Sequence, residues 1–245
     1  MKYRSSAIVI GASGGIGSAL YKGWQDDEDI DSVFVISRQD PTGSDEDASP
    51  LTHFIQCDYS ESSIEHACEA IGKLTDHVSR ICICNGILHN DNVWPEKRIE
   101  ELNLKTLQEL FTINSIIPVL WLKALLPLAR GKNPCVITVF NARIGSIGDN
   151  RSGGWYSYRA SKAALNMLLK TASIEYARRA KNVKLISFHP GTTDTNLSKP
   201  FQNSVKPQDL LSSDTVAASL IKIMNNQTIN GELSYVDWEN KPIVW

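Results

Sequence analysis

The sequence has few cysteines, no excess of positive charge and no metal-ligand spacing among its histidines. The five cysteines are odd in number and form no C-x-x-C pair, which disfavours both a disulfide framework and a structural zinc site. Lysine and arginine total 25 against 27 aspartates and glutamates, so the net charge of -2 provides no basic field for nucleic acid. We therefore expect no metal, no nucleic-acid partner and a reducing environment.

Long hydrophobic runs are also absent. The longest uncharged apolar stretch, residues 110–122, contains Asn114 and Pro118 and ends before Lys123. A membrane-spanning helix needs about 20 apolar residues, so this stretch is too short. The N-terminal MKYRSSAIVI has only four consecutive apolar residues before Gly11, too few for the core of a signal peptide. We expect a cytoplasmic protein with no membrane partner.

Hydrophobic residues make up 42% of the 245 positions, enough for a continuous core and too many for a disordered chain. Because domains average roughly 150 residues and single α/β domains of this length are common, we expect one domain over residues 1–245. The most biased stretch is Asp40–Pro50 (DPTGSDEDASP). Its proline, glycine, serine and acidic residues favour an exposed loop in place of a crossover helix.

Short β-branched runs alternate with longer helix-patterned stretches, which is typical of a parallel sheet with crossover helices. The strands do not alternate in polarity, so both sheet faces are covered. Cys82 and Cys84 are two apart on one strand and therefore face the same way, as small core residues. We predict a doubly wound α/β fold. The predicted strands are 7–10, 32–36, 53–57, 80–84, 135–140, 183–188 and 233–238, and the predicted helices are about 15–25, 61–73, 100–130, 156–180 and 212–225.

A glycine-rich turn, GASGGIG at residues 11–17, follows the first predicted strand and opens the first predicted helix. This order brings unpaired backbone N–H groups and the positive end of a helix dipole to one point, where a pyrophosphate binds. Glycine is required because a β-carbon would block the tight turn or the approach of the phosphate. An ordinary flexible turn is the alternative. The predicted cofactor-binding residues here are Gly11, Ser13, Gly14, Gly15, Ile16 and Gly17.

The end of the second predicted strand bears on the choice of nucleotide. In a Rossmann-like sheet this turn lies beside the adenosine ribose, where a carboxylate binds the 2′-hydroxyl of NAD and an arginine pairs with a 2′-phosphate. The strand ends at Ser37-Arg38 with no acidic residue, so Arg38 favours NADP(H) over NAD(H). The acidic residues of the following loop oppose this choice if that loop folds back. A solvated surface charge is the alternative for Arg38.

Tyr158 and Lys162 are four residues apart in a stretch with helical periodicity, so they lie on one helix face. A phenol has an ordinary pKa near ~10, and an adjacent ammonium group stabilises its anion and lowers that pKa toward neutrality. We therefore predict that Tyr158 donates and accepts a proton. Amphipathic surface helices also produce this pattern, which is the structural alternative. Tyr156 does not have the required spacing.

The spacing Gly11-x-x-x-Gly15-x-Gly17, followed by Tyr-x-x-x-Lys after the fifth strand, resembles the short-chain dehydrogenase/reductase family. Ile10 stands where that family usually has threonine. The resemblance extends along nearly the whole chain and implies a Rossmann fold with strand order 3-2-1-4-5-6-7. It also implies a homodimer or homotetramer that associates through the two long helices. The stretches GSIGDNRSGGWYSYRASKAALNM, GILHN and PGTTDTNLSKPF are most similar to the sniffer-like carbonyl reductases and the C-factor-like signalling branch.

The resemblance assigns roles to further residues. It implies that Lys162 holds the hydroxyls of the nicotinamide ribose, and that Asn114 kinks its helix and holds a water for proton relay. In ICNG the family's N-N-A-G motif is altered, with Cys84 at the second asparagine and Asn85 at the alanine. The polar tract 196–211 is similar to a mobile substrate lid. Further cofactor contacts implied by the resemblance are Asp58 and Tyr59 near adenine, Asn85 and Gly86, and Pro190, Gly191, Thr193 and Thr195 near the nicotinamide.

The chain departs from the family at its serine. That serine lies three residues before a glycine, and alignment on Gly145 places Ala142 there, which has no hydrogen-bond donor. Asn141 is adjacent but points to the other side of an extended backbone. Ser146 is the nearest alternative hydroxyl. Loss of one donor to a developing oxyanion can lower turnover about 10² to 10³-fold.

Two functions follow. The first is reversible hydride transfer between NADP(H) and a small carbonyl or alcohol substrate, with Tyr158 as acid/base beside Lys162 and Asn114. The second is a nucleotide-binding signalling or regulatory protein with weak or no catalysis, which Ala142 allows. The sequence does not specify the substrate.

Overall fold

The computed structural model describes residues 5–40 and 51–245. Its core is a sheet in the order β3-β2-β1-β4-β5-β6-β7, in which every neighbouring pair is parallel. This confirms the predicted Rossmann fold and strand order 3-2-1-4-5-6-7, apart from small shifts at strand ends. The predicted loop at Asp40–Pro50 lies outside the described residues except for Asp40. The strands are β1 (Ser6–Ile10), β2 (Ser32–Ser37), β3 (Thr52–Gln56), β4 (Val78–Ile83), β5 (Cys135–Phe140), β6 (Val183–His189) and β7 (Leu233–Asp237).

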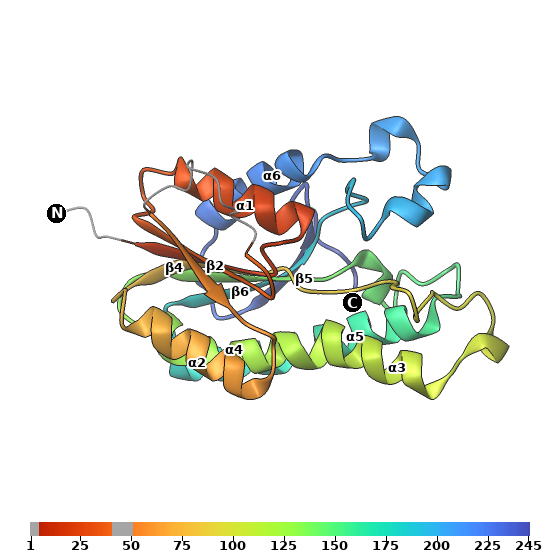
Figure 1. The fold of residues 1–245 in the computed structure, drawn as a ribbon, viewed down its shortest axis with the longest axis horizontal. Coiled ribbons are helices and arrows are strands. Elements are labelled where there is room, and N and C mark those ends of the chain that lie inside the picture. Colours follow the sequence, from red (N-terminus) through yellow and green to blue (C-terminus); the bar gives the residue numbers. More distant parts are fainter. Residues whose placement is uncertain (1–4, 41–50) are drawn as a thin grey trace.

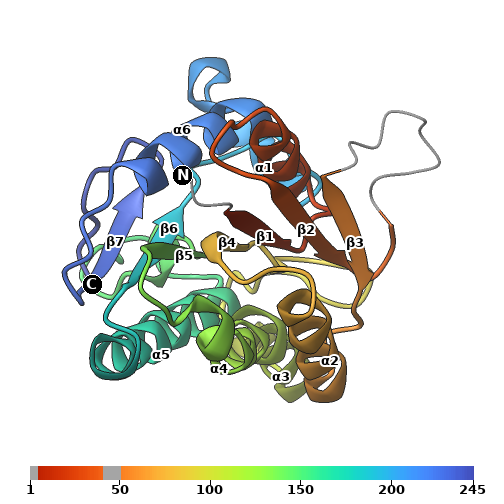
Figure 2. The same ribbon diagram turned by 90° about the vertical axis from the view of Figure 1, so that its left-hand side faces the viewer.

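Helices cover both faces of the sheet. Figure 2 shows α1 and α6 on one face and α2, α3, α4 and α5 on the other. Three of the six α-helices begin at a side-chain cap, where Ser60, Asn103 or Ser212 accepts a hydrogen bond from the backbone N–H three residues on. The α-helices are α1 (Gly15–Gln25), α2 (Glu61–Gly72), α3 (Leu104–Phe111), α4 (Ile117–Ala129), α5 (Tyr156–Arg179) and α6 (Ser213–Asn225).

The helix predicted over residues 100–130 is instead built from several pieces. A 3₁₀ turn, Ile99–Glu101, precedes α3, whose start is fixed by the Asn103 cap. A π-helical turn, Thr112–Ile116, then separates α3 from α4. Pro118 in the first turn of α4 has no N–H for the helical ladder, so the regular pattern cannot run unbroken through this point. The π turn contains Asn114, as expected for a kink at this residue.

Within the described residues, one helical stretch, Leu104–Ala129, is long and apolar enough by length and composition to cross a membrane. Some of its apolar residues belong to the hydrophobic core. Trp121, Leu122 and Leu125 are fully buried and pack in the cluster beneath the sheet with residues of β4 and α5. Core packing therefore accounts for the apolar residues on this buried part of the helix.

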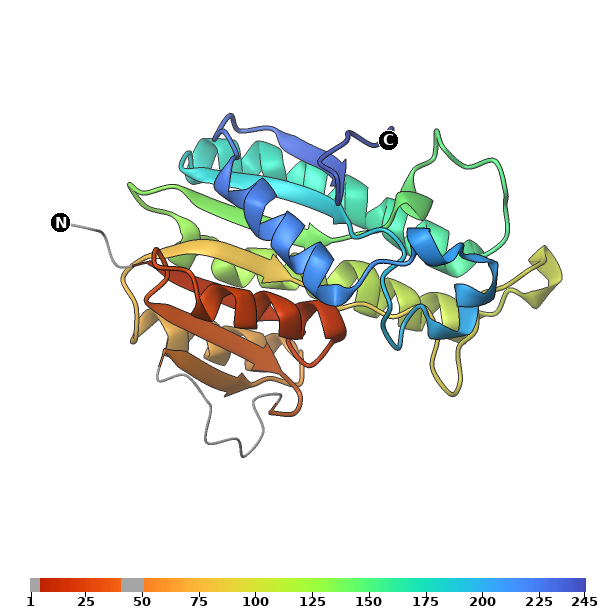
Figure 3. The same cartoon turned by 90° about the horizontal axis from the view of Figure 1, so that it is seen from above.

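Each face of the sheet has its own hydrophobic cluster. One lies between the sheet and the α2, α4 and α5 layer, and the other lies between the sheet and α1 and α6. Cys82 is buried in the second cluster and Cys84 packs against it, so the two thiols share a face as predicted. Because the strands are parallel, all their carboxyl ends meet at one edge, where Figures 1 and 3 show the long connecting loops gathered. Ligands of doubly wound sheets bind at this edge.

Candidate functional site

The glycine loop is formed as the sequence predicts. Gly11 has φ +80°, and a β-carbon there would lie 2.9 Å from the backbone nitrogen of Asn85. A β-carbon at Gly17 would lie 2.5 Å from the carbonyl oxygen of Gly11. Helix α1 has Gly14 at its N-cap and no side-chain cap, so its first-turn N–H groups are suited to an anion. Ser13, Gly14 and Gly15 are exposed at the crest of the loop.

The loop after β6 lies directly beside the glycine loop. A β-carbon at Gly15 would lie 3.0 Å from Cγ2 of Thr195 and 2.9 Å from Oγ of Ser213. Thr193 is buried, and its carbonyl oxygen accepts hydrogen bonds from the hydroxyls of Thr195 and Ser198. Two loops far apart in the sequence thus meet over the switch in strand order between β1 and β4. A dinucleotide fits such a cradle, with its pyrophosphate at the start of α1.

The ends of β2 and β3 form the side of this cradle where the adenosine is predicted to bind. Ser37 is buried and its hydroxyl donates to the carbonyl oxygen of Gln39, whereas Arg38 is exposed. Hydrogen bonds from the side chain and then from the backbone N–H of Ser60 hold the pKa of the Asp58 carboxyl below its ordinary value. Burial raises the pKa of Tyr59 to about 12, against a smaller lowering by the nearby charge of Arg38. Arg38 therefore lies close enough to Tyr59 for its charge to act on the phenol.

Asn85 and Asn114 tie the end of β4 to the π turn. The side-chain amide of Asn85 donates to the carbonyl oxygen of Ile113 at 3.1 Å. Asn114 pairs with the backbone of Ile87 in both directions, at 2.8 Å and 2.9 Å. A β-carbon at Gly86 would lie 3.2 Å from Oδ1 of Asn114. The altered motif ICNG therefore keeps a hydrogen-bonded connection at this strand end.

Tyr158 and Lys162 share one face of α5, and both are buried, at 7% and 4% exposure. Nζ of Lys162 lies 6.0 Å from the ring centroid of Tyr158 and donates to the carbonyl oxygen of Phe140 at 3.0 Å. Burial lowers the pKa of Lys162 to about 7 and raises the pKa of Tyr158 above its ordinary value. The predicted lowering of the phenol pKa is therefore not found in the protein alone, because desolvation, and after it the nearby Tyr235, disfavours the phenolate.

Ala142 is the residue that the family resemblance predicts at the serine position, and neither Asn141 nor Ser146 brings a replacement donor to the cavity. The Asn141 side chain points into the fold, where its amide donates to Asn166 and Ser187. Ser146 is 2% exposed and its hydroxyl accepts from the backbone N–H of Asp149. It does not line the cavity that holds Tyr158. The suggestion that Ser146 supplies the missing donor is therefore not supported by its position.

A cavity of about 420 Å³ joins the predicted catalytic and cofactor residues. Tyr158, Lys162 and Ala142 line it, together with Ile16, Gly86, Gly191, Thr193 and Thr195 from the cofactor loops. The remaining wall is largely apolar, with Leu88, Ile144, Trp155 and Phe201 among its residues. An apolar chamber with a few converging polar groups is typical of a site for a small organic substrate.

An aromatic cluster adjoins the cavity, in which Trp155 and Phe201 line the wall and His89 and Trp94 lie against Phe201. The ring of Trp155 lies 5.0 Å from that of Phe201 and 6.3 Å from that of Tyr158, by centroids. His89 and Trp94 stack at 5.2 Å, and both contact Phe201. The sequence analysis predicted a lid over residues 196–211 without identifying these rings. Trp155, three residues before Tyr158, could have been selected by its spacing, but no local pattern links it to Phe201.

The sequence analysis found no metal-ligand spacing for His189 and gave it no other role, yet His189 lines the cavity. Burial lowers its pKa to about 4, so the ring is neutral at physiological pH. Its Nδ1 atom is buried and has no hydrogen-bond partner within residues 5–40 and 51–245. Its position directly before Pro190-Gly191, which were predicted to contact the nicotinamide, could have identified His189 as a residue of the site.

Comparisons with known proteins agree with this geometry. A family model described as short chain dehydrogenase matches residues 5–206. Benzil reductase ((S)-benzoin forming) of Bacillus subtilis is 29% identical over 92% of this chain and 96% of its own length. A Rhodococcus protein, 1-hydroxy-2-glutathionyl-2-methyl-3-butene dehydrogenase, is 27% identical over 91% of this chain and 92% of its own. C-signal of Myxococcus xanthus is 26% identical over 55% of this chain and 76% of its own.

Solved structures share the fold over almost the whole chain. The NADPH-bound carbonyl reductase from chicken fatty liver superposes with a TM-score of 0.83 at 24% identity and covers 99% of this chain and 100% of its own. The carbonyl reductase Sniffer of D. melanogaster has a TM-score of 0.83 at 21% identity, with the same coverage. These neighbours and C-signal agree with the predicted sniffer-like and C-factor-like branch. The chain therefore belongs to the short-chain dehydrogenase family.

Proposed function

We propose that the chain is an NADP(H)-dependent oxidoreductase that transfers a hydride between the nicotinamide and a small carbonyl or alcohol substrate. One observation carries the proposal: Tyr158 and Lys162 line the same cavity as the loops that form the dinucleotide cradle. When bound, the nicotinamide supplies or accepts the hydride. The phenol of Tyr158 then gives a proton to the substrate oxygen, or takes it back in the reverse direction.

The surrounding residues make this proton transfer possible. Lys162 has three donors in its charged form, and a nicotinamide ribose beside it would offer hydroxyl partners for them. A neighbouring charge of this kind favours the phenolate, which opposes the desolvation that raises the pKa of Tyr158. Asn114 holds the Ile87 backbone next to Gly86 and donates to the Ser161 hydroxyl at 3.2 Å. It thereby fixes the cavity wall near the amine, and we propose that it keeps its predicted role in the proton relay.

Two features support NADP(H) as the nucleotide. Arg38 is exposed at the end of β2, where its guanidinium would pair with a 2′-phosphate. The structurally similar carbonyl reductase from chicken fatty liver binds NADPH.

For the substrate, the Trp155 and Phe201 rings favour an aromatic carbonyl compound, because they offer offset or edge contacts to a further ring. The relatedness to benzil reductases points to the same class.

The missing serine favours a second candidate, a nucleotide-binding signalling protein with little catalysis. Ala142 offers the substrate oxygen no donor, and C-signal is among the relatives. We place this candidate second, because an apolar chamber beside Tyr158 is not needed for nucleotide binding alone. The oligomer predicted from the two long helices, a homodimer or homotetramer, stays a proposal for either function.

The test is NADPH oxidation, followed by absorbance, with a panel of aromatic ketones and diketones. We expect slow but measurable turnover that falls at least about 10²-fold in Tyr158→Phe, since general acid catalysis contributes roughly that much. Tyr156→Phe is the matched control, because Tyr156 opens the same helix outside the cavity lining. Turnover that survives intact in Tyr158→Phe would refute the mechanism. NADPH binding without turnover of any carbonyl compound would favour the second candidate.

A further inference from the structure

Glu96 is a buried carboxylate for which the proposed reaction has no role. It lies in the segment between β4 and α3 and is 2% exposed. The backbone N–H of Ser157 donates to its Oε2 at 3.1 Å, and the hydroxyl of Ser157 donates to its Oε1. The carbonyl oxygen of Glu96 also accepts from the backbone N–H of Trp155, at 2.5 Å. One residue thus accepts three hydrogen bonds at the start of α5.

Helix α5 depends on an acceptor from outside its own chain segment. Its N-cap residue, Trp155, has φ 53° and makes no side-chain cap. Ser157 is 0% exposed, so water cannot supply the partner for its N–H. An unpaired buried donor costs about 1–3 kcal/mol, and the positive end of the helix favours an anion here. A carboxylate meets both requirements.

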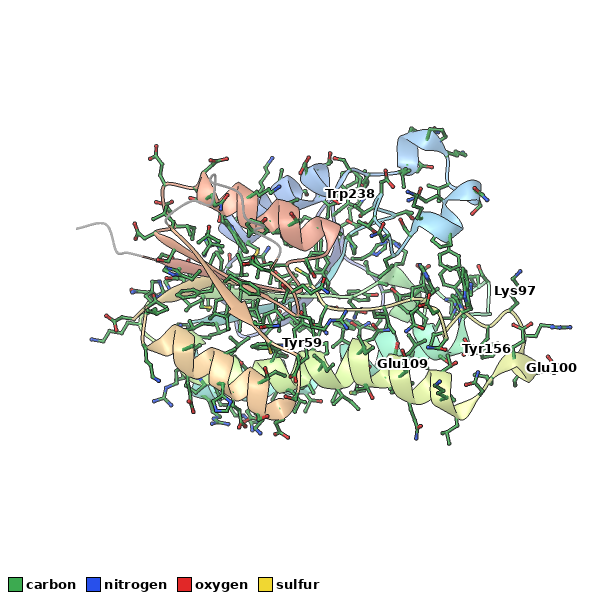
Figure 4. All side chains as sticks on the ribbon, in the orientation of Figure 1. Tyr59, Lys97, Glu100, Glu109, Tyr156 and Trp238 are labelled. Atoms are coloured by element: carbon green, nitrogen blue, oxygen red, sulfur yellow. The ribbon has the colours of Figure 1, made fainter. Side chains whose placement is uncertain are left out.

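We propose that Glu96 is a positioning residue that caps α5 from outside and thereby fixes Tyr158 in the cavity. Tyr158 follows Ser157 directly, so a shift of the first helical turn moves the phenol. The inference rests on the proposed function of Tyr158. Figure 4 shows Lys97, next to Glu96, at the same end of the molecule as Tyr156, the first residue of α5.

The same contact connects the aromatic cluster of His89, Trp94 and Phe201 to the start of the helix that carries Tyr158. The segment that carries Glu96 also carries His89 and Trp94, whose rings contact Phe201. Glu96 therefore ties the segment that carries His89 and Trp94 to the start of α5. A role of this kind affects turnover more than cofactor binding, because the glycine loop lies on other elements.

The experiment compares Glu96→Ala and Glu96→Gln with the wild-type chain. Glu100→Gln is the matched control, since Glu100 is an exposed acid of the same segment. We expect kcat for an aromatic ketone to fall roughly 10- to 100-fold in Glu96→Ala, as a misplacement of about 1 Å can cause. KM and NADPH affinity should change less than about threefold. Glu96→Gln, which keeps one acceptor oxygen, should recover part of kcat, and Glu100→Gln should match wild type.

Hydrogen exchange tests the contact without a substrate. In the protein without added cofactor, the amides of residues 156–160 should exchange faster in Glu96→Ala than in Glu100→Gln. If Glu96→Ala does not fold, Glu96→Gln and Ser157→Ala provide the same comparison. A wild-type kcat in Glu96→Ala, unchanged exchange in the first turn, or parallel losses of kcat and NADPH affinity would overturn the proposal. If the wild-type chain reduces no carbonyl compound, the proposed function fails, and exchange alone decides whether Glu96 holds this turn.

Discussion

Burial determines the charge state of Lys162. The folded chain lowers the pKa of its amine to about 7 from the model-compound value of 10.5. Between these two values the unfolded chain binds the proton that the folded chain has released, so stability rises with pH. We expect the free energy of unfolding of wild type to increase relative to Lys162→Met by up to about 1.4 kcal/mol per pH unit across this window.

Denaturant titrations at several pH values from neutrality to mildly alkaline check this slope. The comparison with Lys162→Met removes the contributions of groups that titrate alike in both chains, and methionine keeps much of the side-chain volume. Tyr158, whose pKa is raised, titrates above this range and does not disturb it. Equal slopes for the two chains would show that the amine stays protonated in the fold.

Ala142 limits how well the substrate oxygen is held. Ala142 lines the same cavity as Tyr158, so a serine there would bring a hydroxyl to the cavity wall. We expect Ala142→Ser to raise kcat roughly tenfold or more without changing NADPH affinity, since one oxyanion donor is worth about 10² to 10³ in turnover. Steady-state kinetics with Ser146→Ala as comparison check this, because that hydroxyl lies outside the cavity. An unchanged kcat in Ala142→Ser would mean that another group already holds the oxygen.

At the level of helices and strands, the sequence predicted the elements well wherever hydrophobic residues recur at a regular spacing. The positions of the strands and the extents of α1 and α5 follow from apolar runs, glycine positions and helical spacing, whereas the strand order was implied by the family resemblance. The helical pattern alone predicted one helix over residues 100–130 and did not predict the π turn at Thr112–Ile116 that separates α3 from α4. Asn114 was correctly placed at the kink through the family resemblance rather than through the pattern.

Contacts between elements were largely beyond the sequence. The cap that Glu96 provides for α5 joins residues 61 positions apart, in a segment without periodicity. The contact between Phe201 and Trp155 likewise depends on the conformations of two loops, which no local sequence pattern predicts. The pKa of Tyr158 beside Lys162 was likewise not predictable from the sequence. The spacing correctly placed both residues on one helix face. It gives no information on burial, however, and burial raises the pKa of Tyr158, which was expected to be lowered.

At the level of the whole molecule, cofactor binding should stabilise the fold, because the cradle joins loops after β1, β4 and β6. A ligand that binds only the folded chain stabilises it by about 2.7 kcal/mol at a concentration of 100 Kd. We expect NADPH to raise the melting temperature more than NADH at equal concentration, since Arg38 stands at the predicted 2′-phosphate position. Arg38→Ala should remove this preference, which we expect to be about tenfold in affinity, or about 1.4 kcal/mol. Lys22→Ala, which removes an exposed cation from α1, should leave it intact. Thermal melts with both nucleotides measure the difference, and equal stabilisation of the wild-type chain by NADH would overturn the assignment of Arg38 to the 2′-phosphate.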